Sequence, residues 1–146
     1  HQYKHFVFRQ YASNKYQVWT NNQVAGSGSR FMSDNGSSTV IGLSRILDTS
    51  KGEKSQSGAS ECIFSSDNRA ECESFISWLN TKFTRFFVAC NISKLTGILT
   101  NDYFRFVPAP PSGKFDHIYT DQELYEAFNL PQKYIDIIES VIKERK

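Results

Sequence analysis

The chain has 146 residues, of which 39% are hydrophobic and 14% aromatic, so it can bury one core of large side chains but not two. No apolar run is long enough to span a membrane, and no signal segment opens the chain. Residues 1–60 hold seven Lys or Arg against three Asp or Glu, whereas residues 108–146 hold five against seven. The first part therefore suits a polyanionic partner, and the last part does not.

The first part of the chain alternates strand-like segments with polar loops. Residues 6–8 and 16–20 have strand-like composition, and residues 39–41 form a further short strand candidate. Polar residues fill 21–38 and 48–60, which predicts two long loops. Loops of this length in a small domain are often functional.

The strongest helical signal follows a strand candidate at residues 62–64. Asn68 is a suitable N-cap, and Glu71 stands where a capping box requires an acidic side chain. Apolar residues with helical spacing then share one arc: Cys72, Phe75, Ile76, Leu79, Phe83, Phe86, Phe87 and Cys90. Polar residues lie opposite: Glu73, Ser77, Asn80 and Thr84. We expect one helix from Asn68 to about Asn91 that organises the core.

The rest of the chain predicts a strand, a linker and two short helices. Residues 102–107 are the strand candidate, and residues 110–113 predict an extended linker. Thr120 is a suitable cap for the first helix, with Glu123 completing a capping box, and Pro131 suits the first turn of the second. The apolar faces of the two helices comprise Leu124, Tyr125 and Phe128, and then Tyr134, Ile135, Ile138, Val141 and Ile142.

The predicted fold class is α+β, with a small, mostly antiparallel sheet packed on one long helix and a C-terminal helical pair. We expect residues 1–107 to form one domain, residues 108–118 a linker, and residues 119–146 the helical pair packed on that domain. The chain starts at His1 rather than Met, so we expect it to be part of a longer protein.

No catalytic constellation stands out. An adenine-gripping Asn/Asp-Pro-Pro-aromatic loop is missing, because Pro110-Pro111 lies between Ala109 and Ser112. The segment after residues 26–28 is unlike the helix that a glycine-rich cofactor loop requires. Nuclease-like Glu-x-Lys spacing occurs only at residues 144–146, and no Gly-x-Ser-x-Gly elbow is present. We therefore expect neither catalysis nor a cofactor in this chain.

The cysteines Cys62, Cys72 and Cys90 are odd in number and lack both Cys-x-x-Cys spacing and a neighbouring histidine. This pattern argues against a disulfide framework and against a zinc site. It favours buried, reduced thiols in a cytoplasmic protein.

Two stretches in the second half of the chain contain several distinctive short sequence motifs in a fixed order. The first is Ser-Phe-Ile-Ser-Trp-Leu-Asn-Thr-Lys-Phe-Thr-Arg-Phe-Phe at 74–87, running on to Phe-Arg-Phe-Val-Pro at 104–108. The second is Tyr-Thr-Asp-Gln-Glu-Leu-Tyr at 119–125, continuing to Ile-Asp-Ile-Ile-Glu-Ser at 135–140. Together they resemble the C-terminal region of bacterial restriction–modification methylases, over roughly residues 60–142. That family includes type II endonuclease–methyltransferase fusions and type III-like adenine methyltransferases.

The resemblance implies a DNA target-recognition (specificity) domain, because this region of the family lies beyond the catalytic modules. Its partners would be double-stranded DNA and the upstream catalytic domains of a bacterial, cytoplasmic parent chain. The parent would be a site-specific adenine DNA methyltransferase, a type II restriction endonuclease, or both. S-adenosylmethionine and magnesium are expected for that parent, and no cofactor or metal for this chain. Departures from the family pattern are Tyr119 for Trp, Asn129 for Gly, and a less acidic linker at 109–114.

Candidate DNA-binding residues lie in the basic first part, where cations can meet phosphates and amides or hydroxyls can read base edges. They are Asn22, Gln23, Ser27, Ser29, Arg30, Arg45, Lys51 and Lys54. Without the resemblance, ordinary hydrophilic loops would be the commoner interpretation of these residues. Lys82 and Arg85 lie beside Trp78, and we interpret both as structural.

Two other functions remain open. The chain could be a module that docks on the catalytic part of the same enzyme through its acidic end. It could also be a free-standing DNA-binding regulator, since residues 120–142 loosely resemble a helix–turn–helix. Against the regulator, the second helix carries Asp136, Glu139 and Glu144, which a major groove would repel.

Overall fold

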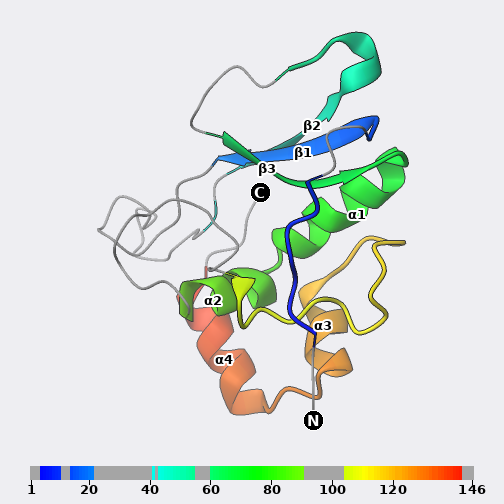
Figure 1. Cartoon of the computed structure of the whole chain (residues 1–146). Coiled ribbons are helices and arrows are strands. Elements are labelled where there is room, and N and C mark those ends of the chain that lie inside the picture. Colours follow the sequence, from blue (N-terminus) through cyan, green and yellow to red (C-terminus); the bar gives the residue numbers. More distant parts are fainter. Residues whose placement is uncertain are drawn as a thin grey trace.

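The computed structural model describes residues 4–10, 14–21, 41, 43–54, 60–90 and 104–142. Their elements are, in chain order, β1 (Tyr16–Asn21), β2 (Ser44–Asp48), the 3-10 helix η2 (Thr49–Lys51), β3 (Ser60–Ser66), α1 (Arg69–Leu79), α2 (Lys82–Cys90), α3 (Asp121–Ala127) and α4 (Gln132–Val141). The strands gather at one end and the helices extend from it (Figure 1), so the fold class is α+β, as predicted.

The three strands form one antiparallel sheet in the order β2-β1-β3. β1 and β3 confirm predicted strands, whereas the sequence did not predict β2. Val18 of β1 pairs with Phe64 of β3, and the Phe64 ring stacks on Phe75 of α1 at 4.3 Å between ring centroids. α1 therefore covers the sheet face that carries Val18 (Figure 1). Because side chains alternate along a strand, Trp19 lies on the opposite face.

The prediction of one long helix is wrong, because the helix is interrupted at Asn80 and Thr81. The Thr81 hydroxyl donates to the Trp78 carbonyl at 2.7 Å and accepts from the Thr84 N–H at 3.1 Å. One threonine thus ends α1 and caps α2. The predicted N-cap of α1 is confirmed: the Asn68 side chain accepts from the Ala70 N–H at 2.9 Å.

The interruption also changes which side chains of α2 are buried. The expected arc placed Thr84 on the polar side and Cys90 on the apolar side, but Thr84 is buried and Cys90 is exposed. Arg85 is buried as well, while Phe86 and Phe87 are only partly buried. A single helical period cannot describe two helices with different directions, so the predicted phase fails beyond Asn80.

Two predicted strands outside the sheet have other conformations. Residues 6–8 are extended but form no strand of the sheet; the Phe6 N–H donates to the Val107 carbonyl at 3.0 Å, and the Arg9 N–H to the Ile63 carbonyl at 2.9 Å. Of the strand predicted at 102–107, the described residues 104–106 form a turn, closed by the Val107 N–H on the Phe104 carbonyl at 3.0 Å. This turn buries Phe104 and Val107 and exposes Arg105 and Phe106, so the buried side chains lie three positions apart and not two as in a strand. Of the candidate at 39–41, only Ile41 is described.

The C-terminal helices are close to their predicted positions. The Thr120 hydroxyl accepts from the Glu123 N–H at 3.2 Å, which confirms the cap of α3. α4 buries Ile138, followed by the buried Ile142, but Tyr134 and Val141 are exposed rather than buried as predicted. The predicted linker at 110–113 is a turn, in which Gly113 has a φ of 72° and the Gly113 N–H donates to the Pro110 carbonyl. All parts contribute to one core, from Phe6 to Ile142.

The predicted capping box of α3 is not formed, because Glu123 binds a histidine instead. His117 lies between two carboxylates, with Nδ1 at 2.8 Å from Asp116 Oδ1 and Nε2 at 2.6 Å from Glu123 Oε2. Its hydrogen bonds with Asp116 and then with Glu123 raise the pKa of His117 above its ordinary value of 6.5.

We expect this cluster to make the stability of the protein depend on pH. The folded-state pKa of His117 is raised, so the stabilisation is fully present below pH 6.5 and is lost as the pH rises through the folded-state value. A His117→Gln variant should melt at a temperature that changes less with pH across that window. Thermal unfolding and an NMR titration of the imidazole measure both effects. An imidazole that titrates below its ordinary pKa would contradict this expectation.

Candidate nucleic-acid interface

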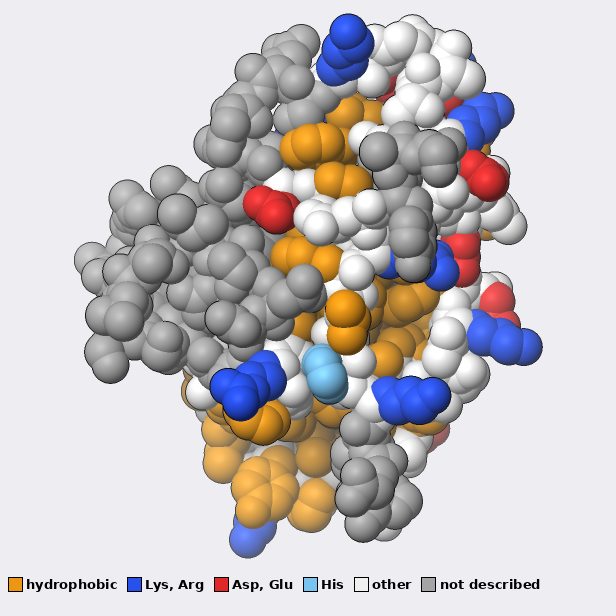
Figure 2. Space-filling model, in the orientation of Figure 1, with side chains coloured by type: hydrophobic (Ala, Val, Ile, Leu, Met, Phe, Trp, Pro, Cys, Tyr) orange, Lys and Arg blue, Asp and Glu red, His pale blue; other side chains and the backbone are white. Residues whose placement is uncertain are grey.

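Three of the eight predicted DNA-binding residues are described, and they lie at one edge of the sheet. Arg45 belongs to β2, the edge strand; Lys51 ends η2, and Lys54 follows three residues later. All three are exposed. Figure 2 shows Lys and Arg side chains projecting at the top of the view, where Figure 1 places β2 and η2. The other five residues lie outside the described ones: Asn22, Gln23, Ser27, Ser29 and Arg30.

The turn that carries the two lysines is held by hydrogen bonds within residues 48–53. Asp48 Oδ1 accepts from the Ser50 N–H at 3.0 Å and from the Ser50 hydroxyl at 2.6 Å. Glu53 Oε1 accepts from the Asp48 N–H at 2.7 Å, and Gly52 has a φ of 77°, which glycine adopts without strain. The predicted loop at 48–60 therefore begins with an ordered turn.

The net charge that this turn presents to solvent is positive. The Ser50 hydroxyl is the main cause that lowers the pKa of Asp48 below its ordinary value of 3.8, so this carboxylate stays ionised. Asp48 and Glu53 both accept hydrogen bonds from the turn itself. Lys51 and Lys54 remain exposed beside them. An exposed cation of this kind can approach a phosphate with little loss of hydration.

The sheet face turned away from α1 adds an aromatic and an amide group to these cations. Trp19 pairs with Arg45 across β1 and β2, so the two side chains share this face. The Trp19 indole N–H donates to Gln17 Oε1 at 2.9 Å. A shallow groove of about 390 Å³ runs from Gln17 and Trp19 to the turn. Its lining residues are Gln17, Trp19, Thr49, Gly52, Glu53 and Lys54.

This combination suits a nucleic acid chemically. Lysine and arginine neutralise phosphates, and a half-exposed indole offers a flat surface on which a base can stack. Gln17 has both an amide donor and an acceptor, the groups that read base edges. Trp19 and Gln17 were missed by the sequence analysis, which treated residues 16–20 only as a strand. The signal that could have found them is the alternation of Gln17, Trp19 and Asn21 with the apolar Val18.

Lys82 and Arg85 belong to the scaffold, in agreement with their interpretation as structural. The Arg85 side chain is 1% exposed, and its Nε donates to the carbonyls of Asn80 at 3.0 Å and Thr81 at 3.3 Å. Lys82 Nζ forms an ion pair with Glu139 Oε1 at 2.7 Å, which ties α2 to α4. Neither cation is available to a phosphate in this arrangement.

The surroundings of the cysteines favour the protonated thiol over the thiolate. Burial raises the pKa of the Cys72 thiol to about 12, and it also raises the pKa of Cys62 and of Cys90. All three thiols are free. The expectation that all are buried is right only for Cys72, because Cys62 is half-buried and Cys90 is exposed. Among the described residues, no cluster of three or more His, Cys, Asp or Glu could hold a metal ion.

Within the part of the chain that the structure describes, no helix has the length and apolar character needed to cross a membrane. Comparison of the chain with protein-family models, with curated proteins and with solved structures found no match.

Proposed function

We propose that the chain is the DNA target-recognition (specificity) domain of a bacterial, cytoplasmic restriction–modification enzyme, with no catalytic centre of its own. The observation that carries the proposal is the sheet face on which Trp19 and Arg45 lie beside the exposed Lys51 and Lys54. In this proposal the cations bind the phosphates of double-stranded DNA, and the sheet face and its loops approach the bases.

The residues that carry the family resemblance form the scaffold of the fold, and this supports the proposal. Asp121, in the second stretch, accepts a hydrogen bond from the N–H of Phe83, in the first, at 2.7 Å. The Ser77 hydroxyl accepts from the Tyr119 N–H at 2.8 Å, which joins the same two stretches again. The resemblance therefore follows residues that hold the fold, while the candidate interface lies before residue 60. A constant scaffold with a separate contact surface is what a family with many DNA targets requires.

Catalysis would belong to the upstream domains of the parent chain, an adenine methyltransferase, a restriction endonuclease or both. S-adenosylmethionine and magnesium would be bound there. The described part of this chain contributes basic, amide and aromatic groups, which select and hold DNA without breaking or forming bonds.

The salt dependence of DNA binding tests the proposal. We expect the triple variant Arg45→Ala/Lys51→Ala/Lys54→Ala to bind duplex DNA more weakly and with a flatter dependence of log K on log salt. Each phosphate contact contributes about 0.9 to the slope, so the loss should approach 2.7. Fluorescence anisotropy of a labelled duplex at several salt concentrations measures this slope.

A matched control replaces two exposed lysines of the acidic end, Lys114→Ala/Lys133→Ala. This double variant should keep the slope of the unmodified protein, because neither lysine lies at the candidate interface. Equal slopes for the triple variant and the unmodified protein would contradict the proposal. The proposal would also be contradicted if the slope of the control fell by as much per replaced cation as the slope of the triple variant.

A second candidate function, docking on the catalytic part, has one observation in its favour. Tyr134, Ile137 and Val141 are each 44–45% exposed and follow one side of α4 at helical spacing. An apolar stripe of this kind suits a protein surface better than DNA. The two functions use different faces, so the triple variant would leave docking unchanged.

A further inference from the structure

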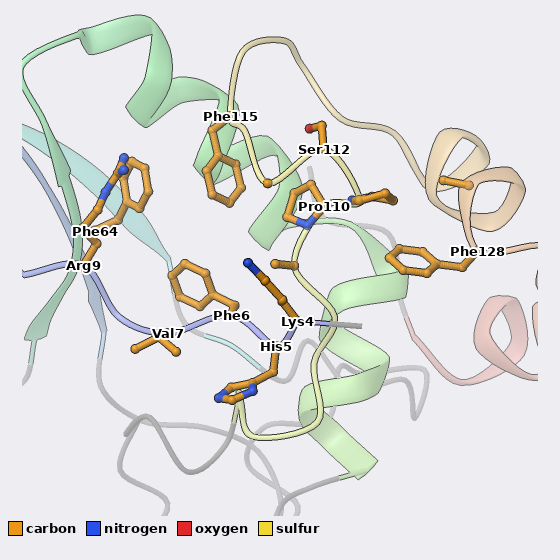
Figure 3. A pocket seen from close by; sticks show the side chains of 14 residues that line it. Lys4, His5, Phe6, Val7, Arg9, Phe64, Pro110, Ser112, Phe115 and Phe128 are labelled. Atoms are coloured by element: carbon orange, nitrogen blue, oxygen red, sulfur yellow. The ribbon is translucent and has the colours of Figure 1, made fainter. Parts of the chain in front are cut away.

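The groove beside Trp19 leaves an aromatic ring of the sheet open to a ligand. On the sheet face that α1 covers, the Phe64 ring is closed in by the Arg9 guanidinium, 4.1 Å from its centroid, and by the Phe115 ring, 5.2 Å away (Figure 3). On the other face, no described cation lies over the half-buried Trp19 indole, and no described ring stacks on it. Of these two rings, Trp19 is the one that a ligand can reach.

The other side of the groove is the ordered turn at residues 49–54. The Thr49 N–H donates to the Lys15 carbonyl at 2.9 Å, which fixes the turn to the residue before β1. A side-chain carbon added at Gly52 would meet no atom within 4 Å, so the space beside the turn is open. The groove volume of about 390 Å³ lies at the lower end of the range for sites that hold small molecules, about 300–1,000 Å³, and therefore suits a single base rather than a duplex.

Two charged side chains of the turn line this groove. Lys54 has no ion-pair partner among the described residues, so it can bind a phosphate. Glu53 Oε1 accepts from the Asp48 N–H at 2.7 Å, whereas Glu53 Oε2 has no hydrogen-bond partner in the described part of the chain. A carboxylate oxygen accepts a hydrogen bond from the exocyclic amine of cytosine or adenine, and it repels the O4 carbonyl that thymine carries in place of the cytosine amine.

Stacking on an indole requires the flat face of a base. In a regular duplex the neighbouring base pairs cover both faces, and only the edges of the bases are open in the grooves. A base in a single strand, or one without a pairing partner inside a duplex, has an accessible face. Such a base stacks readily on an aromatic side chain.

We propose that this groove binds one unpaired base that carries an exocyclic amine, cytosine or adenine. The base stacks on Trp19, its amine donates to Glu53 Oε2, and the adjoining phosphate binds Lys54. This inference rests on the proposed function, because it assigns a part of the bound DNA to the same interface. The base comes either from a single strand or from an unpaired position in a duplex.

Tryptophan fluorescence of the 146-residue protein tests the proposal, because the chain has two tryptophans and Trp78 is inaccessible to solvent. A deoxycytidine hexamer should quench the Trp19 emission saturably, and a thymidine hexamer should bind about fivefold or more weakly. A duplex with one unpaired cytosine should also quench the emission. The regular duplex of the same sequence should bind, as measured by the anisotropy of a labelled strand, without quenching. The tighter ligand of the hexamer and the duplex with the unpaired cytosine identifies the source of the base.

The variant Glu53→Gln isolates the role of the carboxylate oxygen. Glutamine keeps an oxygen for the Asp48 N–H but replaces Oε2 with an amide donor, so the preference for cytosine over thymine should disappear. Glu126→Gln removes the same charge on α3, outside the groove, and should keep that preference. Trp19→Leu should weaken the deoxycytidine hexamer about tenfold, and thermal melts confirm that the variants fold.

The possible outcomes separate this inference from the proposed function. Binding of the regular duplex, without quenching by the hexamer or by the unpaired cytosine, would overturn the inference and leave the proposed function intact. Quenching by the hexamer without duplex binding would contradict the proposed function alone, and the absence of binding to every DNA would overturn both. An equal loss of the cytosine preference in Glu53→Gln and Glu126→Gln would also overturn the inference.

Discussion

Replacing Phe75 with alanine should lower the free energy of unfolding by about 3–5 kcal/mol, the cost of emptying a fully enclosed aromatic site. The Phe75 ring is inaccessible to solvent. It stacks on Phe64 with an interplanar angle of 3° and lies 5.7 Å from the Trp78 ring and 5.4 Å from Phe115. The sheet, α1 and the turn before α3 meet at this one side chain, so the cavity cannot close by a local shift. Denaturant unfolding followed by circular dichroism measures the loss.

Phe106→Ala is the matched control. Phe106 is also a phenylalanine, but its side chain is 68% exposed, so its replacement should change stability by no more than about 0.5 kcal/mol. If both variants unfolded at the denaturant midpoint of the unmodified protein, Phe75 would not occupy the enclosed site described above.

Replacing Asp121 with alanine should lower stability by about 1–3 kcal/mol, although Asp121 belongs to a different helix from the one it caps. Its Oδ1 accepts from the Phe83 N–H at 2.7 Å, one of the first N–H groups of α2, which have no partner inside the helix. Burial raises the pKa of Asp121 above its ordinary value of 3.8, so this half-buried carboxyl has lost part of its hydration at the contact with α2. Removing it leaves the Phe83 N–H buried without an acceptor.

The asparagine variant separates this cap from a general effect of charge. Asp121→Asn keeps an oxygen that can accept from the Phe83 N–H, and asparagine caps helices about as well as aspartate. It should retain most of the stability that alanine loses. A loss as large in Asp121→Asn as in Asp121→Ala would show that the hydrogen bond to Phe83 is not what Asp121 contributes.

Much of the fold follows from local patterns in the sequence. The caps Asn68 and Thr120, the strand at 62–64 and the α+β class were predicted from residues close together along the chain. The break at Asn80 and Thr81 was not predicted, because the apolar spacing continues across both helices and outweighed the local capping signal of Thr81. Its stabilisation by Asp121, thirty-eight positions from Phe83, has no counterpart in periodicity. The turn at 104–106 was predicted as a strand because residues 102–107 have strand-like composition, although the buried Phe104 and Val107 lie three positions apart.

The sequence predicted the charged residues of the candidate site but not how they are arranged in space. The excess of Lys and Arg in the first part indicated Arg45, Lys51 and Lys54 correctly as exposed residues. The pairing of Trp19 with Arg45 could not be anticipated, because β2 lacked a strand signal and without β2 there is no neighbour for Trp19. The contact of Lys4 and Phe6 with Val107 and Ala109 likewise joins segments about a hundred positions apart, and no local pattern indicates it.

The N-terminal segment has a consequence for the order in which the protein folds. The Phe6 N–H bonds to Val107 and the Ala109 N–H bonds to Lys4, so each contact closes a loop of roughly a hundred residues. Such contacts form late, since chain entropy must be lost before they stabilise anything. During synthesis, β1, β3 and α1 can assemble as soon as they emerge, but the place of Phe6 stays open until Val107 and Phe115 have been made. Until then the nascent chain exposes an aromatic surface around Phe75, and this interval is when aggregation competes most strongly with folding.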